Sequence, residues 1–216
     1  MKFSLIVCTY NPKEEWLLRA LKSAEGLFDE YLIVDDGSDK VNVVEILGKM
    51  GVGNYRYFKH DINKGLWQAR NTGVESATGD IIALLDDDDY FDRYGVEGLK
   101  EWIVGSAADI WHFHLQQFNG SNSIYGGGAD CCGLLDNSVI PGVSWYKRSV
   151  WHAVGGYQYP LAEDWDFYLR AYKKGLVFDY YPHVIYNYNR RQDSRSAAWG
   201  GAMFDKIKKE VIDRNK

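Results

Sequence analysis

Four consecutive carboxylates, Asp86, Asp87, Asp88 and Asp89, directly follow the apolar run at residues 81–85. An apolar run of this length predicts a buried strand, so the carboxylates fall where that strand leaves the core. Open α/β sheets bind ligands at this edge. Adjacent anions repel one another unless water, basic side chains or a cation compensates them. The run therefore indicates a divalent metal ion carrying a phosphorylated substrate, with a solvated acidic loop as the alternative.

Polar residues also follow two other predicted strands. Thr9, Tyr10 and Asn11 come after the first strand, where backbone groups and the Tyr ring can hold a nucleotide base by hydrogen bonds and stacking. Asp35 and Asp36 follow the second strand, where a carboxylate can bind uracil or ribose hydroxyls. The alternatives are a tight turn at the first position and an Asp-Gly-Ser turn with an Asx cap at the second.

Arg70 is expected on a helix over residues 64–77 that Asn63 caps and that carries a stripe of small residues. Small neighbours leave the guanidinium room to reach a phosphate or the acidic run. The alternative is a structural ion pair with Asp35 or Asp88.

Asp164 is predicted near the start of a helix over residues 162–174, where the positive helix end favours an ionised carboxylate. An ionised Asp beside a hydroxyl can act as a general base. Composition alone favours the alternative, in which Glu163, Asp164 and Asp166 are merely acids at a helix N-terminus.

These residues need a scaffold of alternating strands and helices. Predicted strands at residues 3–9, 31–34, 55–58 and 81–85 are separated by helical patterns, which indicates βαβ units and a mainly parallel sheet. The later chain has an aromatic, alternating stretch over 109–118, extended segments at 177–181 and 184–188, and a charged helix from 198. We therefore predict a single α/β domain: a mainly parallel central sheet flanked by helices, with a smaller mixed β region.

Composition excludes several classes of protein. The 216 residues are 46% hydrophobic and 25% charged, as in a globular domain, and the net charge of −5 with scattered Lys and Arg disfavours nucleic acid as a partner. Three cysteines cannot form a disulfide framework. With neither a signal-peptide pattern nor an apolar run of about 20 residues, we expect a soluble cytoplasmic protein without a membrane span. No G-x-G-x-x-G follows the first strand, which disfavours a dehydrogenase.

Five segments carry a resemblance to a known family. In chain order they read SLIVCTYN (4–11), VDDGS (34–38), NKG with ARNTG (63–65 and 69–73), LDDDD (85–89), and GGY with EDWD (155–157 and 163–166). Together they resemble family 2 glycosyltransferases of the GT-A fold, over residues 3–196. The resemblance implies one GT-A (Rossmann-like) domain over 1–216, with a nucleotide-sugar half (1–108), an acceptor half (109–196) and a C-terminal helix (197–216).

The implied reaction is a metal-dependent, inverting transfer of a sugar from a nucleotide-diphosphate donor, expected to be a UDP-sugar, to a saccharide, lipid-linked or other acceptor hydroxyl. Mn²⁺ or Mg²⁺ is the implied cofactor. The family's Asp-x-Asp motif maps onto Asp86 and Asp88, although Asp87 with Asp88 or with Asp89 is also possible. The alternative is a non-catalytic nucleotide-sugar or carbohydrate-binding protein of the same fold, and the oligomeric state stays open.

The resemblance also assigns roles to single residues. Asp164 is the implied general base, and Asp88 with Asp86 the metal ligands. The implied nucleotide-sugar contacts are Thr9, Tyr10, Asn11, Asp36, Arg70, Asp86, Asp87 and Arg191. The implied acceptor contacts are Glu163, Trp165, Asp166 and Trp145. Many relatives carry a His at the position of Arg191; arginine cannot ligate a cation, but it can neutralise a departing pyrophosphate.

Overall fold

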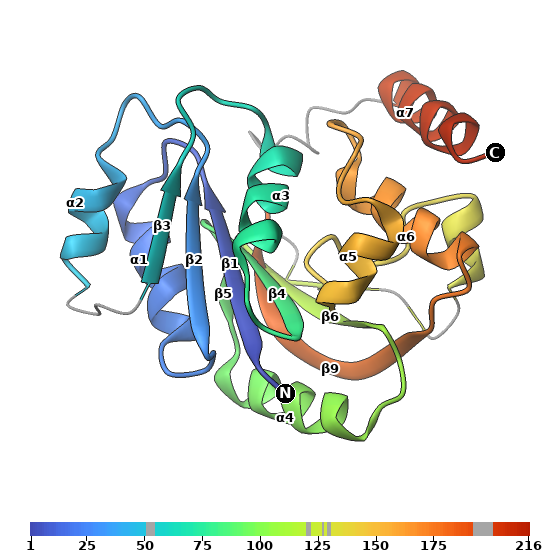
Figure 1. Ribbon diagram of the computed structural model, residues 1–216, viewed down its shortest axis with the longest axis horizontal. Coiled ribbons are helices and arrows are strands. Elements are labelled where there is room, and N and C mark those ends of the chain that lie inside the picture. The colour runs from blue at the N-terminus through green and yellow to red at the C-terminus, as the bar shows by residue number, and fades with distance from the viewer. Residues whose placement is uncertain (51–54, 120–121, 127, 129–130, 192–200) are drawn as a thin grey trace.

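One mixed sheet organises the chain. The computed structural model describes residues 1–50, 55–119, 122–126, 128, 131–191 and 201–216. In this part of the chain the sheet has nine strands in the order β3-β2-β1-β4-β8-β6-β9-β5, with β7 paired to β6 (Figure 1). The strands are β1 (Phe3–Thr9), β2 (Glu30–Asp35), β3 (Tyr55–Lys59), β4 (Ile81–Asp86), β5 (Tyr90–Phe91), β6 (Ile110–Phe118), β7 (Ile124–Tyr125), β8 (Trp145–Lys147) and β9 (Phe178–Asn189).

The predicted parallel sheet is present in the first half, where β1 pairs in parallel with β2 and β4, and β2 with β3. Every residue of β1 is buried, as expected for a central strand covered on both faces. Thr9 pairs with Asp35 and Cys8 with Asp86, so these strands end at one edge. This register brings the polar residues after β1, β2 and β4 together.

Helices connect and cover these strands: α1 (Glu14–Ala24), α2 (Val43–Gly48), α3 (Leu66–Ser76) and α4 (Arg93–Gly105). The predicted close packing of α3 is confirmed at Gly73, where a β-carbon would stand 2.5 Å from a methyl carbon of Ile6 on β1. The start of this helix differs from the prediction. Gly65, with φ of 91°, occupies the N-cap position instead of Asn63, because the amides of Lys64 and Gly65 donate to Asp36 and hold these residues in a loop.

The later strands continue the same sheet instead of forming a separate region. Strand β8 lies between β4 and β6 and is antiparallel to both, and β6 pairs in parallel with β9. The two extended segments predicted at 177–181 and 184–188 are one strand. Its register skips Pro182 and His183, so a bulge accommodates the proline that cannot donate to the ladder.

The remaining helices belong to the second half of the chain. They are the short 3-10 helix η1 (Cys132–Leu135), α5 (Arg148–Val154), α6 (Glu163–Lys173) and α7 (Gly201–Arg214). Helix α7 lies beside α6, away from β1–β3 (Figure 1). Residues 197–200 of the predicted C-terminal helix are outside the described residues. No helix in the described part of the chain is long and apolar enough to cross a bilayer.

Candidate active site

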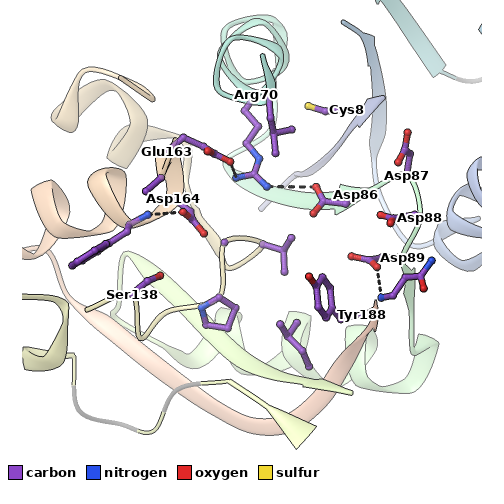
Figure 2. A pocket seen from close by; sticks show the side chains of 18 of the residues that line it. Cys8, Arg70, Asp86, Asp87, Asp88, Asp89, Ser138, Glu163, Asp164 and Tyr188 are labelled. Carbon is purple, nitrogen blue, oxygen red and sulfur yellow. Dashed lines mark hydrogen bonds and ion pairs between the residues drawn. The ribbon is translucent and has the colours of Figure 1, made fainter. Parts of the chain in front are cut away.

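A cavity of about 1090 Å³ opens at the carboxyl edge of β1, β2 and β4 and extends to the start of α6. This volume lies at the upper end of the roughly 300–1,000 Å³ typical of a small-molecule site. Figure 2 shows Asp86 to Asp89 on one side of it and Asp164 on the other. The predicted site residues that line it are Thr9, Tyr10, Asp36, Arg70, Asp86, Asp87, Asp88, Glu163, Asp164, Trp165 and Arg191.

The four carboxylates of the acidic run have different surroundings. Asp87 accepts a hydrogen bond from the Thr9 hydroxyl at 2.5 Å, and burial raises its pKa to about 7. Asp89 is 1% exposed and accepts a hydrogen bond from the Asn189 amide at 2.6 Å. Asp86 and Asp88 are more accessible, with side chains 32% and 15% exposed. All four carboxylates line the cavity, and Asp87 and Asp89 are held there by hydrogen bonds from Thr9 and Asn189.

Arg191 pairs with this run. Its Nε lies 3.1 Å from Oδ2 of Asp88, and its guanidinium lies over the Trp16 ring at 5.1 Å. Burial and the charge of Asp86 nevertheless raise the pKa of Asp88 to about 6, against the opposing effect of Arg191. The negative charge is therefore only partly compensated by the protein.

A divalent cation would compensate the remaining negative charge. The oxygens of Asp86 and Asp88 are hard donors, and an added positive charge would oppose the effects that raise the pKa of Asp88. In the described part of the chain, no three His, Cys, Asp or Glu side chains gather as a metal site. The residues thus suit an open site with two protein ligands, in which phosphate and water oxygens complete the coordination.

Arg70 joins the two halves of the site. It is 3% exposed, and its guanidinium lies 3.4 Å from Asp86 on β4 and 3.3 Å from Glu163 on α6 (Figure 2). Burial alone would lower the Arg70 pKa, but these two carboxylates raise it well above its usual value. The expected alternative of a structural ion pair is therefore present, but with Asp86 and Glu163 in place of Asp35 or Asp88.

The residues after β2 are firmly held. Asp36 accepts hydrogen bonds from the Lys64 and Gly65 amides at 2.9 and 2.8 Å, and its Oδ1 lies 2.6 Å from Nδ1 of His60. Asp35 accepts a hydrogen bond from the Ser38 amide at 2.8 Å, which is the Asx turn considered above. Asp36 lines the cavity in a fixed position.

Asn11 serves the turn after β1. Its backbone has a positive φ of 48°, and its side-chain oxygen accepts hydrogen bonds from the Asp39 and Lys40 amides. It is not among the described residues that line the cavity. Tyr10, its neighbour, is 46% exposed and does line it.

Asp164 lies across the cavity from the acidic run (Figure 2). Its Oδ1 accepts a hydrogen bond from the Trp165 amide at 2.8 Å, which orients the carboxyl group at the start of α6. Glu163, beside it, is 1% exposed and pairs with Arg70. Trp165 is 2% exposed, donates its indole N–H to the Leu134 carbonyl at 2.8 Å, and lines the cavity with its edge atoms.

Two predicted acceptor contacts are corrected by the structure. The Trp145 side chain is fully buried, with its ring 5.5 Å from Phe28 and 6.2 Å from Phe3, because β8 inserts into the middle of the sheet. Asp166 is 1% exposed and pairs with Arg170 at 2.7 Å. Neither residue is among the described residues that line the cavity.

Sequence reasoning missed two parts of the cavity. The loop around Pro141 and Gly142 lines it next to Asp164, and Phe204 and Ile207 of α7 line its far end. The spacing of Phe204, Ile207 and Val211 is that of a buried helix stripe. That apolar periodicity was a usable signal that α7 packs its inner face on the domain.

Comparisons with known proteins agree with this fold. The family model of glycosyl transferase family 2 matches residues 4–130. A Bacillus subtilis protein described as an uncharacterized glycosyltransferase, YwdF, is 31% identical over 99% of this chain and 82% of its own. A Mycobacterium bovis PGL/p-HBAD biosynthesis glycosyltransferase is 24% identical over 86% of this chain and 72% of its own.

The fold also matches a solved structure. Staphylococcus aureus TarS residues 1–349, crystallised with UDP-GlcNAc, superpose with a TM-score of 0.78 at 19% identity, over 100% of this chain and 71% of that one. At this identity the likeness establishes the GT-A glycosyltransferase fold. The family match covers more than half of the chain, and the B. subtilis relative is similar over nearly all of it. The chain therefore belongs to glycosyl transferase family 2 and is a glycosyltransferase.

Proposed function

We propose that the protein transfers a sugar from a UDP-sugar to an acceptor hydroxyl, in one displacement that inverts the anomeric centre and depends on a divalent metal ion. The observation that carries the proposal is the arrangement of one cavity: an accessible carboxylate pair with an arginine on one side, and Asp164 on the other. The TarS structures with UDP-GlcNAc and UDP support a uridine nucleotide as the donor.

The donor occupies the edge formed by β1, β2 and β4. Asp36 and Thr9, held by the hydrogen bonds described above, recognise the base and ribose, and Tyr10 covers the nucleotide at the rim. Arg191 neutralises the diphosphate, since it already lies over the acidic run. Arg70 orients Asp86.

Asp88 and Asp86 would hold Mn²⁺ or Mg²⁺. The bound ion supplies electrostatic stabilisation of the charge that develops on the leaving diphosphate. Arg191 also stabilises the negative charge on the leaving diphosphate. Asp87 and Asp89 keep the end of β4 in place through their hydrogen bonds with Thr9 and Asn189.

Asp164 acts as the general base. The acceptor oxygen attacks the anomeric carbon while its proton passes to the Asp164 carboxylate. The bond between the anomeric carbon and the diphosphate oxygen breaks, and its electron pair leaves with the diphosphate. Because attack and departure occur on opposite faces, the configuration inverts. Glu163 and Trp165 flank the base and position the acceptor side of the cavity.

UDP release from UDP-sugars in the presence of Mn²⁺ tests the proposal. The wild-type protein is expected to release UDP. Asp164→Asn should bind the donor with similar affinity but release UDP about 10²–10⁴-fold more slowly. Asp88→Asn should lose the Mn²⁺-dependent binding of the donor. A thermal-shift screen of nucleoside diphosphates with and without Mn²⁺ measures the binding separately. Donor binding without turnover for any acceptor would instead indicate a binding protein.

A further inference from the structure

The two ends of the cavity differ in chemistry. The donor end carries the acidic run with Arg70 and Arg191, whereas the end near Asp164 is built from β6, β7, the loop before β8, α6 and α7. The side chains that line this second end are mostly apolar: Leu115, Tyr125, Ile140, Pro141, Val143 and Phe204. The acceptor therefore enters a largely hydrophobic space.

Charged groups are few at this end. Glu163 is buried and pairs with Arg70, and Asp164 is the proposed base. Arg190 lies at the boundary with the donor end, where its charge affects Tyr125. In the described part of the chain, this end carries no cluster of basic side chains that would bind an acidic acceptor. Asn137 and Ser138 supply neutral hydrogen-bonding groups.

Two of these apolar side chains are also exposed at the protein surface. Tyr125 is 52% exposed although it lines the cavity. On α7, Phe204 is partly exposed and lines the cavity as well. Two separate elements thus present large apolar side chains to the same cavity. Exposed apolar surface that adjoins a cavity with a few polar groups is typical of a site that binds an apolar ligand.

We infer that the acceptor is amphipathic: its reacting hydroxyl meets Asp164, and an apolar body next to that hydroxyl packs on Phe204 and Tyr125. This inference rests on the proposed function, because it assigns the second substrate of the same cavity. The apolar body is an aryl group or an alkyl chain, as in an aromatic glycoside or a lipid-linked saccharide. Phe204 is then a specificity-determining residue for the acceptor.

The test compares acceptors that share one saccharide and differ in the aglycone: the free sugar, its methyl glycoside, its p-nitrophenyl glycoside and its octyl glycoside. UDP release is measured for each with the donor saturating. The p-nitrophenyl or octyl glycoside is expected to have a KM at least about tenfold below that of the methyl glycoside. Whichever of these two acceptors has the lower KM shows whether the apolar body is an aryl group or an alkyl chain. Equal KM values for all four acceptors would overturn the inference.

Variants of Phe204 and Tyr125 test whether these side chains cause the preference for an apolar acceptor. Phe204→Ala and, independently, Tyr125→Ala should raise the KM for the apolar acceptor by about tenfold and raise the KM for the methyl glycoside much less. Tyr94→Ala is the matched control, since Tyr94 is an 82% exposed aromatic on α4 that is not among the residues lining the cavity. An unchanged KM in both cavity variants would overturn the assignment.

The same series separates this inference from the proposed function. UDP release that requires an acceptor but is equal for all four contradicts the amphipathic acceptor and leaves sugar transfer standing. If turnover is absent, calorimetric titration of the octyl and p-nitrophenyl glycosides into wild type and Phe204→Ala, each with UDP present, decides. Binding that Phe204→Ala weakens supports the apolar site, and no binding in either protein rejects it.

Discussion

Gly142 and Asp164 are packed so closely that a β-carbon at position 142 would stand 2.4 Å from Oδ2 of the Asp164 carboxylate. The loop that carries Gly142 is held by the Ser144 amide and hydroxyl, which both donate to the Pro141 carbonyl. A side chain at 142 must therefore displace the carboxylate, which is the flexible partner. Gly142 is a positioning residue for the proposed base.

Gly142→Ala is accordingly expected to fold normally and to lower kcat by about 10²-fold, because a misplacement of about 1 Å at a reacting group costs this much. The donor KM should stay unchanged. Gly105→Ala is the control, since a β-carbon there meets nothing within 4 Å. Steady-state kinetics of both variants, with thermal unfolding to verify the fold, checks the prediction; equal kcat values in the two variants would contradict it.

Arg70 provides a second prediction, on stability. Arg70→Met removes the cation that faces the buried Glu163 carboxylate, and breaking a buried ion pair by removing one partner typically costs about 3–5 kcal/mol. Combining Arg70→Met with Glu163→Gln also removes the buried negative charge and should recover part of this loss. Urea unfolding of the two single variants and the double variant measures the coupling. Additive losses would show that the Arg70–Glu163 pair is energetically unimportant.

The sequence predicted the site best where strand periodicity and chemistry coincide. An apolar run followed by polar residues locates Thr9, Asp36 and Asp86, because the ends of parallel strands meet at one edge. The motif resemblance then identified the family, which the comparisons confirm. Single-residue roles on that edge remain proposals.

Prediction failed where tertiary packing decides. The residue type of Trp145 suits a sugar-binding platform as well as a core position. Only the position of β8 between β4 and β6 shows that its ring is buried in the core. Asp166 and Asp164 lie two residues apart on one helix turn, and Arg170, one turn further along, pairs with Asp166. Gly142 was invisible in the sequence, since its role depends on contact with a residue 22 positions away.

Arg191 leads to a third prediction, on metal binding. Its charge lies 3.1 Å from Asp88, so it opposes the entry of a cation at that carboxylate. Arg191→Ala should bind Mn²⁺ severalfold more tightly in the absence of nucleotide, yet release UDP about 10²-fold more slowly, because the leaving diphosphate loses a positive partner. Arg93→Ala, on the α4 surface, is the control. Mn²⁺ titration followed by electron paramagnetic resonance, together with turnover, distinguishes this from a general loss of fold, which would weaken both.

Glu30 provides a fourth prediction, on the pH dependence of stability. Its carboxylate joins β2 to the turn before β4, accepting hydrogen bonds from the Ser4 hydroxyl and from the Thr78 and Gly79 amides. Burial disfavours the charged form, but these hydrogen bonds outweigh it and lower the Glu30 pKa below its usual value. A lowered folded-state pKa contributes stability that is present above the unfolded pKa, about 4.3, and lost as the pH falls through the folded value.

Glu30→Gln should therefore be less stable than wild type at pH 7, and the difference in the free energy of unfolding should shrink as the pH falls below about 4.3, because the wild-type carboxyl then takes up a proton. Glu97→Gln is the control, since the Glu97 side chain is 51% exposed on α4 and should show no such trend. Urea unfolding of the three proteins from pH 7 to pH 3 measures the differences. If the difference in the free energy of unfolding between wild type and Glu30→Gln stays constant over this range, the contribution of the hydrogen bonds to Glu30 does not depend on its charge.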